Sequence, residues 1–217
     1  KSKPGARFIY TNSTALIMSL VINKISGLAL DVFADQYFFK PLAMARTTFH
    51  PEVLDRSKIA PTEVDDWRGR IIQGEVHDEG AFVLQQGGYY IGVACIFSIA
   101  DYLLNFLEML LGAGLYKGRR YFSEAMVREM HTSQLVNSQE EVGLGWDLNS
   151  KHKMGNLSSS QVFGHSGFTG TMVVCDPLRE VSIIILSNRT FPKRPATGDA
   201  INLFRHDIAD IVFKYGK

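Results

Sequence analysis

The chain has 217 residues, and 46% of them are hydrophobic, which is enough for one domain with a substantial core. Its 23 Lys and Arg nearly balance its 22 Asp and Glu and form no basic run, so nucleic acid is not expected as a partner. The apolar stretch Leu16–Ile22 is too short to span a membrane and contains Ser19. Two cysteines are too few for a disulfide framework and leave the redox compartment undecided.

The first part of the chain predicts two helices. Asn12 or Ser13 is expected to cap a helix that ends at Gly27, where glycine allows a left-handed stop. This helix is apolar on nearly every side, and we therefore expect it to be buried. A second helix is predicted from Leu30 to Phe39, and Pro41 ends it.

Glycine and proline punctuate residues 51–92, which are predicted to form long, ordered loops with short helices. Loops of this length in a compact domain are usually functional. The triplet His77-Asp78-Glu79 has the composition of a metal site, but three consecutive residues cannot easily face one ion. We therefore expect no metal and no other cofactor, and interpret the triplet as a loop that lines a cleft or as a solvated turn.

Two more helices and then a set of strands are predicted in the second half of the chain. Ser98 is expected to cap a helix from Ile99 to Leu111. Ser123 is expected to cap a helix from Glu124 to His131. After the fourth helix, the spacing of apolar residues changes from helical to strand-like. Strands are predicted at Leu144–Leu148, within Gln161–Asp176 and at Val181–Leu186.

The last two strands are separated by a short connection and are predicted to form an antiparallel hairpin. The β-branched run Val181–Leu186 predicts a strand that is covered on both faces. An amphipathic helix is predicted from about Asp199 to Lys214. Its apolar face is expected to consist of Ile201, Phe204, Ile208, Ile211 and Val212.

Two polar stretches stand out as candidate functional residues. His165-Ser166-Gly167 lies between glycines near the predicted hairpin, which suggests a backbone-lined site or, alternatively, a glycine-rich β-bulge at a sheet edge. Tyr10-Thr11-Asn12 precedes the first helix, whose rigid end would hold polar groups steady. The alternative for this stretch is that Tyr10 packs in the core and Asn12 is only a helix cap.

Several segments occur in the order found in the serine β-lactamase and penicillin-binding-protein superfamily, and the chain resembles its class C and esterase-like branch. The segments, with the family patterns, are Pro4–Ser13 (P-G-x-x-F-x-Y-S-N-x), Phe39–Met44 (F-x-P-L-G-M), Val76–Ala81 (V-H-D-E-N-A), Phe97–Leu103 (F-S-T-A-x-D-L), Leu144–Trp146 (L-G-W), His165–Thr171 (H-T-G-F-T-G-T, which replaces K-T-G) and Leu186–Arg189 (L-x-N-R). Each match is weak alone, but together they cover nearly the whole chain.

The resemblance implies an α+β fold of the α/β sandwich type, with an antiparallel sheet flanked by helices and a helical subdomain. Residues 1–217 would form an N-terminally incomplete domain of the β-lactamase/transpeptidase type. Its helical and loop-rich region would reach about residue 135, and the sheet strands and C-terminal helix would follow from about residue 140. The resemblance also implies a periplasmic or other extracytoplasmic location.

The family's chemistry gives roles to both polar stretches. A serine attacks an acyl carbon, forms an acyl-enzyme and loses its proton to a tuned base. The resemblance implies that Tyr10 shuttles this proton and that Asn12 binds the substrate's amide and helps to orient the Lys of S-x-x-K. It also implies that His165 takes the place of the Lys in K-T-G, where it polarises the phenol of Tyr10 or, when protonated, binds the substrate carboxylate.

The three residues after His165 complete the implied contacts. Ser166 would add a hydrogen bond to the substrate carboxylate, and Gly167 would let the backbone approach closely. The N–H of Phe168 would be one of two oxyanion-hole donors, and the nucleophilic serine would supply the other. The implied partner is thus a small-molecule or peptide acyl substrate.

The nucleophile motif S-x-x-K is expected upstream of this chain, in a missing N-terminal portion of the same domain. The literal match Ser150–Lys153 lies in a polar connection without a helical pattern and is interpreted as a coincidence. The chain as given is therefore expected to be inactive. A sheet edge left unpaired by the missing strands is expected to promote self-association.

Several positions depart from the family pattern. Val93, Cys95 and Ile99 stand where close relatives have His, Gly and Thr, and Ala43 replaces the Gly of P-L-G-M. These changes indicate altered substrate choice or a loss of catalysis. The leading hypothesis is part of a serine hydrolase acting on an amide, ester or β-lactam bond. The alternative is a non-catalytic module of the same fold, such as one that binds cell-wall peptides.

Overall fold

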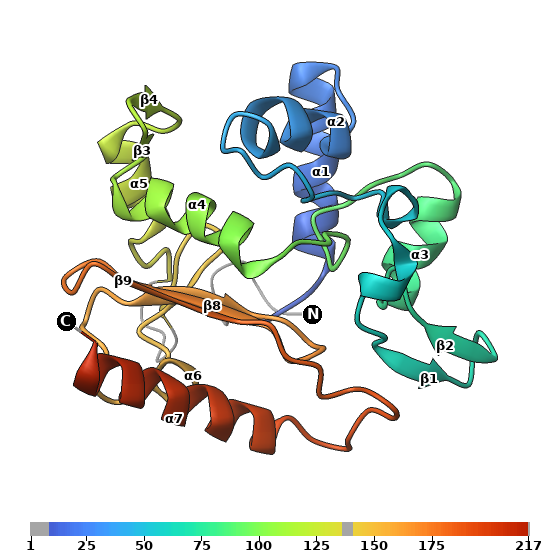
Figure 1. Ribbon diagram of the computed structural model, residues 1–217. Coiled ribbons are helices and arrows are strands. Elements are labelled where there is room, and N and C mark those ends of the chain that lie inside the picture. Colours follow the sequence, from blue (N-terminus) through green and yellow to red (C-terminus); the bar gives the residue numbers. More distant parts are fainter. Residues whose placement is uncertain (1–8, 136–140, 217) are drawn as a thin grey trace. The chain divides into compact units, whose positions relative to one another are not determined.

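Figure 1 shows the structure, a computed structural model that describes residues 9–135 and 141–216. The chain divides into two compact units. The N-terminal unit consists of Tyr10–Leu103 and Asn188–Pro195. The sheet unit consists, in its described part, of Ile9 and residues 104–135, 141–187 and 196–216. Helices are combined with antiparallel sheets, which confirms the predicted α+β fold.

The described helices are α1 (Ser13–Ser26), α2 (Leu30–Ala34), α3 (Glu79–Gln86), α4 (Ala100–Leu111), α5 (Glu124–Met130), α6 (Lys151–Met154) and α7 (Asp199–Tyr215). A π-helical segment, Asp35–Phe39, continues α2, and two short 3-10 helices follow at Pro51–Val53 and Arg56–Lys58. The described strands are β1 (Glu63–Asp65), β2 (Arg70–Ile72), β3 (Leu115–Tyr116), β4 (Arg119–Arg120), β5 (Glu141–Val142), β6 (Asp147–Leu148), β7 (Phe163–Ser166), β8 (Met172–Asp176) and β9 (Val181–Ile185).

The sheet unit is built on an antiparallel sheet with the strand order β5-β6-β7-β8-β9. Helix α7 runs along one face of β8 and β9, as Figure 1 shows in red and orange. The core on this face consists of Met154, Val162, Met172, Val174, Ile183, Ala209 and Phe213. β9 is an edge strand of the described sheet, and the predicted self-association through an unpaired edge stays a prediction for it.

The N-terminal unit contains α1, the segment from α2 to Phe39, the β1–β2 hairpin and α3. Loop 188–195 belongs to this unit because its side chains bind β1 and the residues just before it. The Asn188 amide donates to the Pro61 carbonyl, and the Arg194 guanidinium lies 2.6 Å from the Glu63 carboxylate. The predicted long loops of residues 51–92 are thus ordered, and they include the hairpin, which was not predicted.

Helix α1 has the predicted extent, and Gly27 ends it with a left-handed φ of 72°. However, the prediction that this helix is buried is wrong for the described chain. Ile17, Leu20 and Ile25 are 56%, 57% and 81% exposed, respectively. Its buried residue is Ser19, whose hydroxyl accepts a hydrogen bond from a backbone N–H of a neighbouring loop at 2.9 Å. The apolar residues on all sides of α1 predicted contacts all round the helix. In the structure, the described residues pack against α1 on one side only.

The three predicted caps differ in outcome. Asn12 occupies the predicted N-cap position of α1, but its side chain makes no cap hydrogen bond, and the Thr11 hydroxyl accepts from the N–H of Ser13 at 3.2 Å. The Ser98 hydroxyl lies 2.7 Å from the hydroxyl of Thr47, and α4 begins two residues later. The Ser123 hydroxyl caps α5 by accepting a backbone N–H, as predicted.

The segment from Gln161 to Asp176 forms two strands where one was predicted. β7 and β8 pair in regular antiparallel register, so the β-bulge interpretation is also wrong. The chain reverses at 167–171, where Gly170 adopts a φ of 120°, a conformation that favours glycine. Similarly, the predicted strand Leu144–Leu148 is a strand only at its end, because Gly145 turns the chain with a φ of 83°.

The predicted hairpin of the last two strands is confirmed as β8–β9, but Ile183 is the buried residue of β9, which is therefore not covered on both faces. Helix α7 also has the predicted extent, but its buried residues are Arg205, Ala209 and Phe213. The predicted apolar face was rotated, because Phe204 and Ile211 are 46% and 55% exposed.

No described helix is by itself long and apolar enough to cross a bilayer. Helix α1 meets that criterion jointly with residues 30–39, as a pair bent by 74°.

Candidate functional site

The His165 side chain lies on the face of the sheet opposite α7. His165 pairs with Val173, and Ser166 pairs with Met172. Because side chains alternate along a strand and cross-strand partners share a face, Met172 identifies the core face, and His165 is on the other. His165 is exposed, and Ser166 is half-buried. His165 is therefore exposed on the sheet and not buried inside it.

The loop after His165 is closed by short hydrogen bonds. The N–H of Gly167 donates to the Thr171 carbonyl at 2.7 Å, and the N–H of Gly170 donates to the Gly167 carbonyl at 3.2 Å. A Cβ at position 167 would collide with the Thr171 hydroxyl, so a larger residue there would force that hydroxyl to move. Phe168 stands at the tip of this loop with 54% of its side chain exposed.

Helix α7 and the residue segment that follows β9 both donate hydrogen bonds to this loop. Arg205 is only 3% exposed, and its Nη2 donates to the carbonyls of Gly167 at 2.7 Å and Thr171 at 2.9 Å. Its Nη1 donates to Asn202 Oδ1 at 2.9 Å. In addition, the hydroxyl of Ser187, just past β9, donates to the Gly170 carbonyl at 2.8 Å. The loop is therefore anchored from two elements of the sheet unit.

Tyr10 and Asn12 lie at the start of α1 in the N-terminal unit. Tyr10 is 69% exposed, so the interpretation of Tyr10 as a core residue is wrong. The Asn12 amide donates to Asp78 Oδ2 at 3.3 Å, while Asp78 Oδ1 accepts the N–H of Ala81 at 2.8 Å and caps α3. The predicted site residues therefore form two sets, one in each unit.

The triplet 77–79 forms the entry to α3, and the interpretation of it as a solvated turn is wrong. The His77 side chain is 10% exposed, and its Nε2 lies 3.5 Å from the Glu63 carboxylate. Burial lowers the pKa of His77, so the ring is neutral at pH 7. Glu79 pairs with Arg194 at 3.0 Å, which ties the triplet to loop 188–195. Within residues 9–135 and 141–216, no group of three or more His, Cys, Asp or Glu residues is arranged to hold a metal ion.

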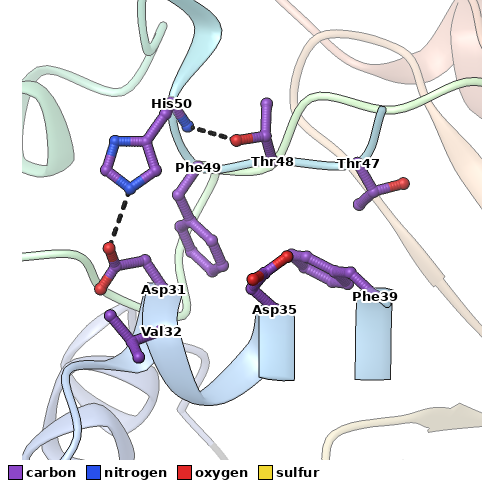
Figure 2. Close-up of a pocket in the computed structure, with 8 residues that line it drawn as sticks. All are labelled: Asp31, Val32, Asp35, Phe39, Thr47, Thr48, Phe49 and His50. Carbon is purple, nitrogen blue, oxygen red and sulfur yellow. Dashed lines mark hydrogen bonds and ion pairs between the residues drawn. The ribbon is translucent and has the colours of Figure 1, made fainter. Parts of the chain in front are cut away.

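A small pocket of about 170 Å³ lies in the N-terminal unit, away from the predicted residues in sequence (Figure 2). Its lining residues are Asp31, Val32, Asp35, Phe39, Thr47, Thr48, Phe49 and His50. His50 Nε2 lies 2.8 Å from Asp31, and Nδ1 lies 3.1 Å from Glu52. Burial opposes protonation of His50, but the hydrogen bonds to both carboxylates outweigh it and raise the pKa. These contacts pair His50 with two carboxylates, as in a structural ion-pair cluster, although the second carboxylate oxygen of Asp31, Oδ1, is buried without a hydrogen-bond partner among the described residues.

The positions that depart from the family pattern have different environments. Cys95 is 1% exposed, and burial raises the pKa of its thiol, so it is an inert core residue. Val93 is half-buried, and Ile99 is 45% exposed. Ala43 adopts a φ of 56°, the left-handed region that favours the glycine of the family pattern.

The literal S-x-x-K match begins a short helix, α6, although no helical pattern was predicted there. Its Lys153 pairs with Asp147 at 3.3 Å, and the hydroxyl of Ser150 lies 3.2 Å from His152 Nδ1. These contacts direct the lysine toward a carboxylate and the serine toward a histidine. They support the interpretation of the match as a coincidence.

Sequence reasoning missed Arg205, Ser187 and the contact of Asp78 with Asn12. A signal for Arg205 existed, because it shares a helix face with Ala209 and Phe213 at four-residue spacing. A charge on such a core-facing stripe needs buried partners. No sequence pattern could have found the contact of Asp78 with Asn12, because it joins residues 66 positions apart.

A family model described as Beta-lactamase matches residues 1–207. A relative from Escherichia coli O157:H7, named "Putative D-alanyl-D-alanine carboxypeptidase", is 31% identical over an aligned length of 206 residues, and the match covers 86% of this chain and 46% of the relative. The chain thus spans about half the length of the curated relatives it matches.

Two solved structures share the fold. A penicillin-binding protein homologue from Pyrococcus abyssi, described as octameric, has a TM-score of 0.67 at 21% identity and is matched over 100% of this chain and 44% of its own. The simvastatin synthase of Aspergillus terreus has a TM-score of 0.70 at 15% identity, over 99% of this chain and 57% of its own.

Proposed function

This chain belongs to the β-lactamase family, and from that premise we propose that the full-length protein is a serine hydrolase. It forms and hydrolyses an acyl-enzyme on an amide, ester or β-lactam bond. The name of the curated relative makes a peptide that ends in D-alanyl-D-alanine the first amide to test.

In this proposal each of the predicted site residues has a role in acyl transfer by the full-length protein. Tyr10 shuttles the proton of the nucleophile, and Asn12 binds the acyl-side amide. His165 polarises the Tyr10 phenol or, when protonated, binds the substrate carboxylate, to which Ser166 also donates. The N–H of Phe168, which follows Gly167, donates to the developing oxyanion.

The exposure of Tyr10, Asn12 and His165 is the observation that carries the proposal. Each is a polar side chain near the end of a helix or strand, none is buried in the core, and the Asn12 side chain makes no cap hydrogen bond. Exposed polar groups on rigid elements are suited to binding a substrate.

The nucleophile is proposed to lie outside these 217 residues. Their S-x-x-K match has its lysine bound to Asp147, so it does not fit the role. The chain by itself is therefore expected to be inactive. Reading the coding sequence upstream of Lys1 tests this point. If no S-x-x-K motif precedes an apolar helix there, the proposed catalytic function is wrong.

The decisive experiment treats the full-length protein with a penicillin probe and measures its intact mass. We expect a covalent adduct of one probe per chain that decays with time as the acyl-enzyme hydrolyses. Saturable binding without an adduct would contradict the proposal and favour a non-catalytic module. The buried Cys95 and the exposed Ile99 at altered positions are the features that such a module would explain.

A further inference from the structure

Helix α7 supplies the charged group that anchors the loop after His165, and we propose that Arg205 is a positioning residue for the Phe168 oxyanion donor. The inference rests on the acyl-transfer function proposed above. Arg205 acts through the peptide that joins Gly167 to Phe168 and does not touch the substrate. Its role is to fix the direction of one backbone N–H.

The planarity of the peptide bond transmits the contact. In a trans peptide the C=O of Gly167 and the N–H of Phe168 lie in one plane and point in opposite directions. Arg205 Nη2 binds the Gly167 carbonyl oxygen at 2.7 Å from the α7 side of the loop. The N–H of Phe168 must therefore point away from Arg205. Rotating the peptide plane would break the hydrogen bond to the guanidinium, so the donor is held in one orientation.

The shape of the guanidinium suits this task. One nitrogen, Nη2, joins both ends of the loop, at the Gly167 and Thr171 carbonyls. The other, Nη1, is held by Asn202 one helical turn earlier, which fixes the plane of the group. A lysine ammonium is a point charge on a flexible stem and cannot bind the two loop carbonyls and Asn202 in one fixed plane. The positive charge at the carbonyl also polarises the peptide, which strengthens its N–H as a donor.

Burial makes the anchor rigid. Arg205 is 3% exposed, so little water competes for its hydrogen bonds. Arg179 offers a contrast within the same unit, because it is 37% exposed at its side chain and pairs with Asp176 at 2.9 Å near the β8–β9 turn. This ion pair lies outside the loop 167–171. Replacing Arg179 therefore removes a guanidinium from the same unit without removing an anchor of the loop, which makes it a matched control.

The test uses the full-length protein and a chromogenic β-lactam under single-turnover conditions. The amplitude counts folded, reactive sites, whereas the acylation rate constant reports stabilisation of the transition state. Arg205→Gln is expected to lower the rate constant at least about tenfold, toward the ~10²–10³-fold loss that follows removal of an oxyanion donor. Arg205→Lys should fall between it and wild type, while Arg179→Gln should keep the wild-type rate constant.

Hydrogen exchange of the amides at 167–171 gives a second readout that does not depend on acylation. Exchange is expected to be faster in Arg205→Gln than in wild type or in Arg179→Gln. If Arg205→Gln does not fold, Asn202→Ala replaces it and should give a smaller decrease in the same rate constant. A wild-type rate constant in the folded Arg205 or Asn202 variant, with only the amplitude reduced, would overturn the positioning role. Faster exchange in a protein whose wild type forms no adduct would instead refute the proposed function and leave the anchor in place.

Discussion

The two sets of proposed site residues are held in very different ways. The loop after His165 is anchored by a buried guanidinium, by the Ser187 hydroxyl and by its own closing hydrogen bonds. By contrast, Tyr10 is exposed, and the Asn12 amide donates to Asp78 Oδ2 at 3.3 Å. One set is therefore preorganised by its own unit, and the other is only loosely held.

The difference between the loop 167–171 and the residues Tyr10 and Asn12 concerns how firmly each is held for catalysis. Catalytic groups must be held within about 0.5 Å of their working geometry. The loop at 167–171 meets that demand from contacts inside the sheet unit. Tyr10 and Asn12 have fewer such contacts, and they stand next to a helix, α1, whose apolar residues Ile17, Leu20 and Ile25 are exposed. The predictions below test this difference.

The largest effect is expected from Tyr10→Phe in the full-length protein. Loss of the phenol removes the proposed proton shuttle, and general acid–base groups contribute about 10²–10⁴-fold to rate. Acylation by a penicillin probe should slow by that factor, as followed by intact mass against time. Tyr89→Phe removes another exposed phenol and is the matched control. Equal acylation rates in the two variants would contradict the role of Tyr10.

The strand that leads to the loop should become less stable in acid because of His131. This ring stacks on Phe163 of β7 with centroids 3.6 Å apart, and burial lowers its pKa to about 4. The pKa of this ring in the unfolded chain is about 6.5. Between about pH 4 and pH 6.5, His131 is therefore protonated in the unfolded chain but neutral in the folded one. Its stabilising contribution is present above about pH 6.5 and is lost as the pH falls to about 4, up to roughly 3 kcal/mol.

The measurement for His131 is the urea midpoint as a function of pH. His131→Phe keeps a stacked ring but cannot bind a proton, so its midpoint should fall less steeply between pH 6.5 and 4. Parallel curves for the variant and wild type would show that His131 does not contribute to the acid sensitivity.

A smaller effect is expected from Gly167→Ala. The new Cβ would collide with the Thr171 hydroxyl, and overpacking of this kind costs about 1–3 kcal/mol. Urea unfolding should show that loss. Gly198→Ala is the control, because a Cβ there meets only the Asn202 amide at 3.8 Å. Equal stabilities would mean that the loop is looser than its hydrogen bonds imply.

The smallest effect concerns Asp78, the partner of Asn12. Asp78→Ala removes the cap of α3 and should cost about 1 kcal/mol in thermal or urea unfolding. Asp78→Ser keeps a capping oxygen but loses the second carboxylate oxygen, so stability should recover while the Asn12 contact is lost. If both variants acylate like wild type, the Asn12–Asp78 contact does not position Asn12.

The sequence predicted those elements whose signals are local. The extents of α1 and α7 followed from periodicity and from glycine at an end. The β7–β8 turn was missed because Gly167 and Gly170 were interpreted as close-approach glycines inside one strand. The family segments identified the candidate residues in both units, but they carried no information about what holds each in place.

The remaining features depend on partners far away in the sequence. The three-residue strand β1 places Glu63 in a buried position, which is tolerable only because Arg194 binds its carboxylate. Likewise, Arg205 is buried because two loop carbonyls more than 30 positions away accept its hydrogen bonds. Neither partner can be inferred from local propensity, because a charged residue alone predicts an exposed position.

The central claim is that Tyr10 and His165 both act in acylation by the full-length protein, and a double-mutant cycle tests it most directly. Acylation rate constants would be measured for full-length wild type, Tyr10→Phe, His165→Ala and the double variant. Residues that act as a unit are non-additive, so the double variant should be little slower than the slower single variant. Fully additive losses, or no loss in either single variant, would contradict the claim that Tyr10 and His165 work together.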